Sequence, residues 1–402
     1  MEFWIPYGET EVPIRVPDDN FYKILEPPRT AAKDPSALVD QALNSPVGGV
    51  SISSFGRGRA GIVVGPLVPP RIVEVTLEQL RKRMTPMGID SVTVFLRKHS
   101  SSASIVQSQV ETVLVDPSEG PFVELGKTAS GTPVEVREDF HSCEVKISLG
   151  MVTPHFATGF TGGPEAILPG VCSLETETKN RSLLLKGTGP SDDNAQGLIL
   201  TDTLDACKLV GPVLSISCVP DGSRGLESVF SGELEATFKE ATSRYSQVHT
   251  ARVDVRPDIT VLAAGQVFGA DLYHGVRVLP NAWNAAKRDG TLILAAECAK
   301  GVGDETFLEF SRKFEDRKSL LTDLRHHFKP GGHVALLLKE AVERNRVQLV
   351  SVLPDHYVRM FNLKSARTAS AAIQSSIRAE GKDARVLIVT RGDLTLPVFT
   401  KN

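Results

Sequence analysis

Short apolar runs alternate with longer amphipathic stretches along the chain from about residue 256 onward. Each run is bounded by glycine or polar residues and precedes a helical spacing of apolar positions, which is typical of parallel strands covered by helices on both faces. The expected strands are residues 259–265, 291–297, 347–353 and 385–390, and the expected helices are residues 272–287, 305–327, 334–344 and 365–380. The pattern predicts a doubly wound, mostly parallel sheet, which binds ligands at the carboxyl ends of its strands.

The preceding part of the chain alternates less regularly. A hairpin is expected from two extended pieces, residues 3–8 and 12–17, whose prolines indicate edge strands. Further along, the pattern predicts a helix over 36–43, a strand over 48–53, a loop over 55–61, a helix over 77–83, a strand over 91–96 and shorter strands, mixed or antiparallel, over 110–150. We therefore predict an α/β fold of two domains, residues 1–255 and 256–402.

Composition and charge exclude several classes of protein. The 402 residues are 41% hydrophobic and 23% charged, which is typical of a globular protein. A net charge of −3 gives no reason to expect nucleic acid or a membrane as partner, so a small molecule is expected. The five cysteines are scattered, and no stretch approaches the roughly 18 apolar residues of a membrane span. These features predict reduced thiols and a cytoplasmic location.

One segment, TPHFATGFTGGPEAILPG at residues 153–170, is dense in glycine and proline around a single histidine. Such glycines either let a ligand approach the backbone closely or only allow tight packing of the chain. His155 could exchange protons near neutral pH, although a lone histidine is more often structural. His99, after an expected strand, and Arg59, between two glycines, are further candidates, for proton transfer and for a bidentate contact with a carboxylate.

The remaining histidine group, His326, His327 and His333, flanks a Pro-Gly-Gly turn. In the sequence this group resembles a metal-binding site, but adjacent histidines on a helix point in different directions. We interpret these histidines as structural. The chain contains no P-loop, no GxGxxG after a strand, no HExxH and no GxSxG, so the common cofactor and hydrolase signatures are absent.

The whole chain resembles the lactate racemase family, whose members interconvert or epimerise 2-hydroxy acids with a nickel-pincer nucleotide. The segments that carry the resemblance are LGKTASGTPVEV, ISLGMVTPHFATGFTGGPEAILPGV and DLYHGVRVLPNAWNAAKRDGTLILAAECAKGVG. The resemblance implies a cleft between the two α/β domains. It also implies an isomerase that abstracts a hydride from a 2-hydroxy acid or a related hydroxy-carboxylate and returns it.

The resemblance also assigns roles to individual residues. His155 matches a catalytic acid/base histidine of the family, and His99 stands near the second one in a different local context. Arg59 matches the arginine of an Asp-x-Thr-Arg-Pro loop, without its aspartate and proline. The remaining substrate-binding positions are Tyr273, His274 in place of a glutamine, and Arg277 in place of a lysine.

The cofactor positions depart from the family pattern. Gly162 and Gly163 match its glycines, but Glu165 stands where a lysine would tether the cofactor, and Arg181 stands where a histidine would bind nickel. A carboxylate cannot form that tether, and a guanidinium offers no lone pair to a metal. We expect Glu165 and Arg181 to form an ion pair, with a metal site undefined and the pincer nucleotide bound non-covalently or not at all.

Three functions therefore remain open. The first is a racemase or epimerase of the family with altered cofactor attachment. The second is an acid/base enzyme in the same cleft that needs no nickel, because such chemistry requires only positioned proton donors and acceptors. The third is a non-catalytic protein that binds carboxylates.

Overall fold

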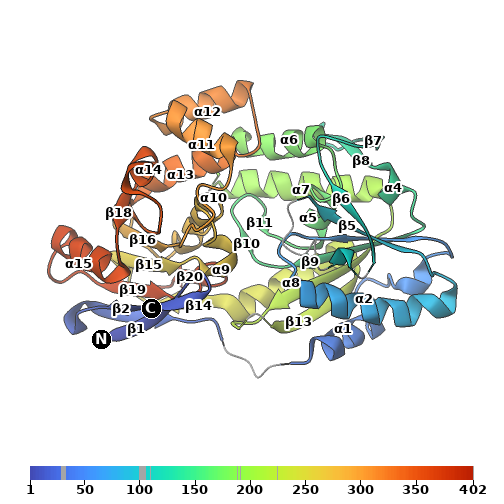
Figure 1. The fold of residues 1–402 in the computed structure, drawn as a ribbon, viewed down its shortest axis with the longest axis horizontal. Coiled ribbons are helices and arrows are strands. Elements are labelled where there is room, and N and C mark those ends of the chain that lie inside the picture. The colour runs from blue at the N-terminus through green and yellow to red at the C-terminus, as the bar shows by residue number, and fades with distance from the viewer. Residues whose placement is uncertain are drawn as a thin grey trace.

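The computed structural model describes residues 1–28, 33–98, 106–108, 110–187, 189–190, 192–223 and 225–401. It contains two α/β units that lie side by side, each built on a six-stranded sheet (Figure 1). The expected α/β fold with two domains is confirmed. No helix in these ranges is long and apolar enough to span a lipid bilayer.

The sheet of the first unit has the order β13-β12-β9-β4-β5-β6. Its strands are β4 (Ala60–Val64), β5 (Val92–Arg97), β6 (Glu111–Val115), β9 (Val145–Met151), β12 (Leu214–Pro220) and β13 (Leu226–Glu233). All neighbours are parallel except β12 and β13. The antiparallel extension expected within residues 110–150 is a separate hairpin of β7 (Phe122–Lys127) and β8 (Pro133–Arg137).

Helices cover both faces of this first sheet. One core packs α1 (Pro35–Asn44) and α2 (Pro70–Met84) against the sheet. On the other face lie α5 (Gly163–Ile167), α7 (Asp193–Val210) and α8 (Leu234–His249), with the short α4 (Glu138–His141) and α6 (Leu174–Ser182) nearby. The strands are buried on both sides and therefore consist of almost continuous apolar runs.

The sheet of the second unit is entirely parallel, with the order β18-β17-β16-β15-β19-β3. Its strands are β3 (Phe21–Leu25), β15 (Ile259–Ala263), β16 (Thr291–Ala295), β17 (Arg346–Val350), β18 (Lys364–Ala366) and β19 (Val386–Val389). One face carries α10 (Leu272–Val276), α11 (Glu305–Lys313), α12 (Arg317–His326) and α13 (Gly332–Arg344), and the other carries α15 (Ala369–Glu380). The doubly wound sheet predicted from the apolar runs is confirmed.

The first 25 residues belong to the second unit and not to the first. β3 pairs in parallel with β19, and the hairpin of β1 (Glu2–Tyr7) and β2 (Thr10–Arg15) packs on the face that carries α15. In Figure 1 the blue hairpin accordingly lies beside red elements. The expected division at residue 255 therefore misplaces this segment. The physical reason is burial: Ile5 and Ile14 are fully buried against the second sheet.

The two units are also in contact near the end of the chain. β20 (Leu396–Phe399) pairs in parallel with β14 (Thr250–Val253), which follows α8 directly. The Tyr245 hydroxyl on α8 also donates a hydrogen bond to the carbonyl oxygen of Leu394. The chain therefore crosses between the units at several points.

Several expected elements differ from those observed. Residues 48–53 form no strand, because Gly48 and Gly49 adopt positive φ angles of 69° and 77° in a turn. The helix expected over 272–287 ends early, near Pro280, which lacks the N–H of a helix interior. The helix expected over 305–327 is two helices, because Asp316 caps the second one by accepting a hydrogen bond from the Ser319 amide.

Candidate functional site

The glycine-rich segment crosses the edge of the first sheet where β9 ends. It forms a small hairpin of β10 (Pro154–His155) and β11 (Gly159–Phe160) and then enters α5. Glycine is required here because the backbone is tightly packed. A Cβ at Gly150 would lie 2.3 Å from the carbonyl carbon of Gly162, and a Cβ at Gly163 would lie 2.3 Å from the Ser215 hydroxyl oxygen. Gly162 and Gly163 therefore seat α5 against the sheet, and α5 carries Glu165 toward His155.

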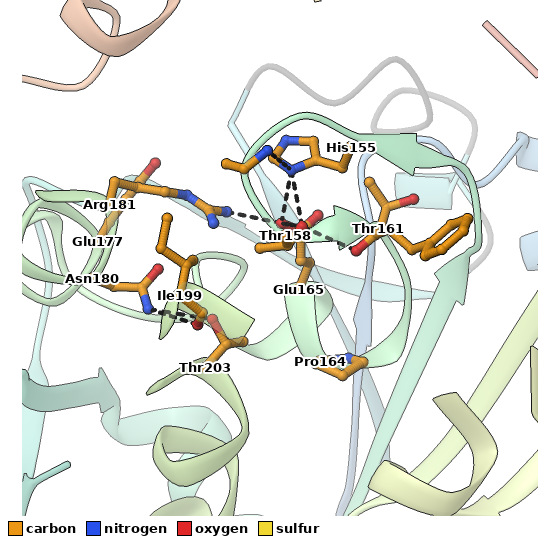
Figure 2. A network of polar contacts seen from close by, with 12 residues as sticks. His155, Thr158, Thr161, Pro164, Glu165, Glu177, Asn180, Arg181, Ile199 and Thr203 are labelled. Carbon is orange, nitrogen blue, oxygen red and sulfur yellow. Dashed lines mark hydrogen bonds and ion pairs between the residues drawn. The ribbon is translucent and has the colours of Figure 1, made fainter. Parts of the chain in front are cut away.

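His155, Thr158 and Glu165 form a connected polar group (Figure 2). The Thr158 hydroxyl oxygen lies 2.9 Å from His155 Nδ1 and 3.1 Å from Glu165 Oε1. His155 Nδ1 also lies 3.7 Å from Glu165 Oε1. Both ionisable side chains are nearly buried, with 8% and 12% of their surface exposed. The loop therefore holds an imidazole and a carboxylate together out of bulk water.

Arg181, on α6, completes this group. Its Nη2 donates a hydrogen bond of 3.0 Å to Glu165 Oε1, and only 8% of its side chain is exposed. The next residue toward the N-terminus, Asn180, is fully buried and donates to the Asp202 carboxylate at 2.9 Å, which anchors the end of α6. The ion pair expected between Glu165 and Arg181 is therefore present, and it is buried.

The surroundings of His155 keep its imidazole neutral. Burial lowers its pKa well below 6.5, and the positive charges of Arg277 and Arg181 lower it further. The Ala157 amide donates to Nδ1 at 3.3 Å, so Nδ1 is the acceptor and Nε2 carries the proton. In this form His155 presents an N–H donor that can stabilise an oxygen on which negative charge develops.

The second unit contributes Arg277, which follows α10, and His333, in the first turn of α13. Both gather around Phe156: the Arg277 Cζ lies 5.7 Å from the centre of the Phe156 ring, and the His333 ring stacks on it at 5.6 Å. The His155 ring lies 4.9 Å from the Phe156 ring. Side chains of both units therefore meet around Phe156. The segment 153–170, Arg181 and Arg277 were expected to lie close together, and they do.

The two arginines carry unused hydrogen-bond donors at this place. Arg181 Nη1 and Arg277 Nε are buried, and neither has a hydrogen-bond partner among the described residues. Within the same ranges, Arg277 also lies in no ion pair, whereas Arg181 is paired with Glu165. The site therefore has one uncompensated positive charge and buried N–H groups directed at no acceptor, which favours an anionic ligand.

The other residues expected near Arg277 lie at the edge of the group. Tyr273 packs its ring against Phe307, and burial raises the pKa of its phenol to about 12. His274 is held by Asp271, whose two carboxylate oxygens both lie 2.8 Å from its Nδ1. His274 is partly exposed, and its ring is oriented by this carboxylate.

Arg59 does not reach the site, contrary to expectation. It lies immediately before β4, at the amino end of the strand, whereas the loop of His155 follows the carboxyl end of the parallel neighbour β9. Its guanidinium donates to the Asp139 carbonyl and the Ser142 hydroxyl, at 3.1 and 2.6 Å. The sheet therefore separates Arg59 from the site. His99 lies outside the described residues.

A cavity of about 780 Å³ opens between the two units beside this cluster. Both sheets reverse their strand order there: β4 neighbours β9 in the first sheet, and β15 neighbours β19 in the second. The segments after these four strands line the cavity, and such reversal points are where ligands bind in doubly wound folds. Phe268 lines the cavity and lies 5.7 Å from the Arg277 Cζ. Phe268 therefore lies between the cavity and the cluster, and His155, Arg181, Arg277 and His333 do not themselves line the cavity.

Sequence reasoning missed His333 and Thr158 as members of the cluster. His333 was expected to be structural together with His326 and His327, which are exposed on α12 and just after it. The signal that could have indicated His333 is its place directly after Gly331 and Gly332, where a helix begins. Thr158 carried no signal apart from its position in the glycine-rich loop.

The fold and this cluster define a two-domain α/β protein with a buried, positively charged site between its domains. The family model for the lactate racemase N-terminal domain matches residues 7–190, and that for the lactate racemase C-terminal domain matches residues 253–395. The chain belongs to the lactate racemase family. This membership supports a racemase-type isomerase activity at the level of the family.

Individual relatives agree over nearly the full length. The lactate racemase of Thermoanaerobacterium thermosaccharolyticum is 24% identical and that of Lactiplantibacillus plantarum 22% identical, each covering 96% of this chain and 97% of the relative. The structure of the T. thermosaccharolyticum lactate racemase apoprotein superimposes with a TM-score of 0.85 at 20% identity, covering 99% of this chain and all of the other. A protein from Thermotoga maritima superimposes with a TM-score of 0.67 at 13% identity over 92% of this chain.

The residues at the cofactor positions do not fit a covalently attached nickel-pincer nucleotide. The carboxylate of Glu165, which the resemblance places at the tether position, accepts a hydrogen bond from Arg181 and lies 3.1 Å from the Thr158 hydroxyl oxygen. Arg181 at the ligand position is a cation without a lone pair for a metal. The described residues also contain no group of three or more histidine, cysteine, aspartate or glutamate side chains able to hold a metal ion.

Proposed function

We propose that this chain is a racemase-type isomerase that binds a small 2-hydroxy-carboxylate at the cluster of His155, Arg181 and Arg277. The observation that carries this proposal is the pair of buried guanidinium N–H groups, on Arg181 and Arg277, without partners among the described residues. A carboxylate placed between them would accept both donors and compensate the charge of Arg277. Charge-assisted hydrogen bonds of this kind are about twice as strong as neutral ones.

His155 would face the hydroxyl group of the ligand. Its neutral imidazole presents Nε2–H, which would donate a hydrogen bond to that oxygen and stabilise the negative charge that develops there. The imidazolium is not favoured beforehand, because burial and the two arginines lower the pKa of His155 well below 6.5.

The cofactor forms a separate part of the proposal. We infer that the chain carries no covalently attached pincer nucleotide, because Glu165 and Arg181, which the resemblance assigns to the tether and nickel-ligand positions, form an ion pair with each other. Nickel content and mass, measured under native and denaturing conditions after co-production with the cofactor's biosynthetic enzymes, test this inference. Nickel together with added mass that survives denaturation would contradict it.

Binding and turnover of 2-hydroxy-carboxylates test the main proposal. Calorimetric titration measures binding, and chiral chromatography measures interconversion of the two enantiomers. The Arg277→Gln variant should lose most of the binding, while Arg312→Gln, which changes an exposed arginine on α11, should bind as the parent does.

Each result bears on the proposal. Binding that depends on Arg277 together with inversion would support it. Binding that depends on Arg277 without inversion would favour a carboxylate-binding protein, and binding equal in the parent and Arg277→Gln would refute the placement of the ligand.

A further inference from the structure

We propose that His333 contacts the ligand beyond its 2-hydroxy-carboxylate group, and that this ligand is a monocarboxylate with a further hydroxyl group on its carbon chain. The inference rests on the proposed function and narrows its substrate class. It is carried by the place of His333 in the site, by the direction of its hydrogen bonds and by the charges around it.

His333 approaches the site from the opposite unit to His155. It begins α13 in the second unit, and only 7% of its surface is exposed. Its ring lies between Phe156, at 5.6 Å, and Phe328, at 5.9 Å. Phe156 is also the ring beside which His155 and the Arg277 guanidinium lie. A ligand held by Arg277 and His155 would therefore extend along Phe156 to His333.

The hydrogen bonds of His333 leave it one free donor. The Gly331 amide donates to its Nδ1 at 3.2 Å, so the neutral ring carries its proton on Nε2. Burial, together with the charges of Arg181 and Arg277, lowers the pKa of His333 well below 6.5, which keeps the ring neutral. Within the described ranges no hydrogen bond involves Nε2, and this atom is not among the fully buried side-chain atoms that lack a partner, so it is accessible to a ligand.

A purely structural role accounts poorly for this arrangement. A side chain that only packed between Phe156 and Phe328 would need no polar atom, whereas Nε2 of His333 is an unpaired donor that remains accessible. His155 shows the same geometry, with a backbone amide donating to Nδ1 and an unused Nε2–H. The two imidazoles therefore bring N–H donors from the two units to the same ring, Phe156, which would suit a ligand with acceptor oxygens at both ends.

Several ligands could accept a hydrogen bond from His333, and the charge of the site indicates which of them fits best. Glu165 compensates Arg181, both imidazoles are neutral, and Arg277 remains as one unpaired cation within the described part of the chain. One carboxylate balances that charge, whereas a second carboxylate would be buried without a cation. A hydroxyl group accepts the Nε2–H of His333 without adding charge. A polyhydroxy acid therefore fits better than a dicarboxylate or an alkyl hydroxy acid.

Calorimetric titration with three ligands tests the inference: lactate, malate and 2,3-dihydroxypropanoate. The parent protein should bind the dihydroxy acid roughly 2- to 10-fold more tightly than lactate, the contribution of one neutral hydrogen bond, and malate more weakly than the dihydroxy acid. The His333→Phe variant should lose the preference and keep its affinity for lactate. His333→Gln, which retains an N–H donor, should keep part of the preference. His326→Ala, which changes an exposed histidine at the end of α12, should behave as the parent does.

The outcomes separate the inference from the function on which it rests. Binding of lactate that depends on Arg277 but shows no preference for the dihydroxy acid would overturn the inference alone. A preference for malate, or one that persists in His333→Phe, would overturn it as well. If no ligand binds, or Arg277→Gln binds all three as the parent does, the proposed function fails together with the inference. If His333→Phe does not fold, the comparison of His333→Gln with the parent decides whether His333 causes the preference for the dihydroxy acid.

Discussion

The buried ion pair between Glu165 and Arg181 makes a quantitative prediction about stability. Replacing Glu165 by leucine leaves the Arg181 guanidinium, only 8% exposed, without a carboxylate at 3.0 Å. Removing one partner of such a pair costs about 3–5 kcal/mol, because the remaining charge stays buried. A change of 1 kcal/mol shifts the melting temperature of a 150–250-residue domain by about 2–4 °C. Glu165→Leu should therefore lower the melting temperature of the first domain by roughly 6–20 °C.

The double variant Glu165→Leu/Arg181→Met gives the decisive comparison. Replacing both partners of a buried pair by apolar residues of similar volume is often neutral or stabilising, so the double variant should melt near the parent, above either single variant. Calorimetry of all four proteins completes a double-mutant cycle. Glu78→Leu, which removes the exposed pair with Lys82, is the control and should leave the melting temperature unchanged. If the losses of the two single variants simply add in the double variant, Glu165 and Arg181 do not stabilise each other.

Three further predictions follow from the same region of the protein. Because His155 and His333 have folded-state pKa values well below 6.5, the unfolded chain takes up protons first as the pH falls below about 6.5. Stability should decline below that pH by up to about 1.4 kcal/mol per pH unit for each histidine, with no contribution above it, and His155→Gln/His333→Gln should flatten the slope. Gly150→Ala, whose Cβ would lie 2.3 Å from the carbonyl carbon of Gly162, should destabilise the fold, measured by urea denaturation. Cys218, fully buried with a thiol pKa raised to about 12, should resist iodoacetamide in the native protein and react after unfolding, as followed by mass spectrometry.

Each of these predictions has a result that contradicts it. An unchanged slope of stability against pH in the double histidine variant would mean that the two imidazoles are not held neutral in the folded protein. A Gly150→Ala protein with the parent's urea midpoint would show that the loop can move away from the strand. Modification of Cys218 under native conditions would show that the first sheet opens readily.

Local sequence patterns determined much of the fold and part of the site. Strands such as Ile259–Ala263 and Thr291–Ala295 are buried on both faces, so each appears as a continuous apolar run that can be recognised without a structure. The approach of Glu165 to Arg181 was inferred from two substituted positions in a long family motif. Their interaction follows from opposite charges that burial brings together.

Tertiary structure alone decided which distant segments meet. The first hairpin packs against strands and a helix that lie far from it in sequence, and its place on the second sheet depends on the apolar surface left uncovered beside α15. Arg59 has the flanking glycines of a ligand-binding loop, yet it lies at the wrong end of its strand. His333 joins the site only because α13 begins opposite Phe156. Periodicity describes contacts within a few residues, whereas a site between two domains depends on packing across the whole chain.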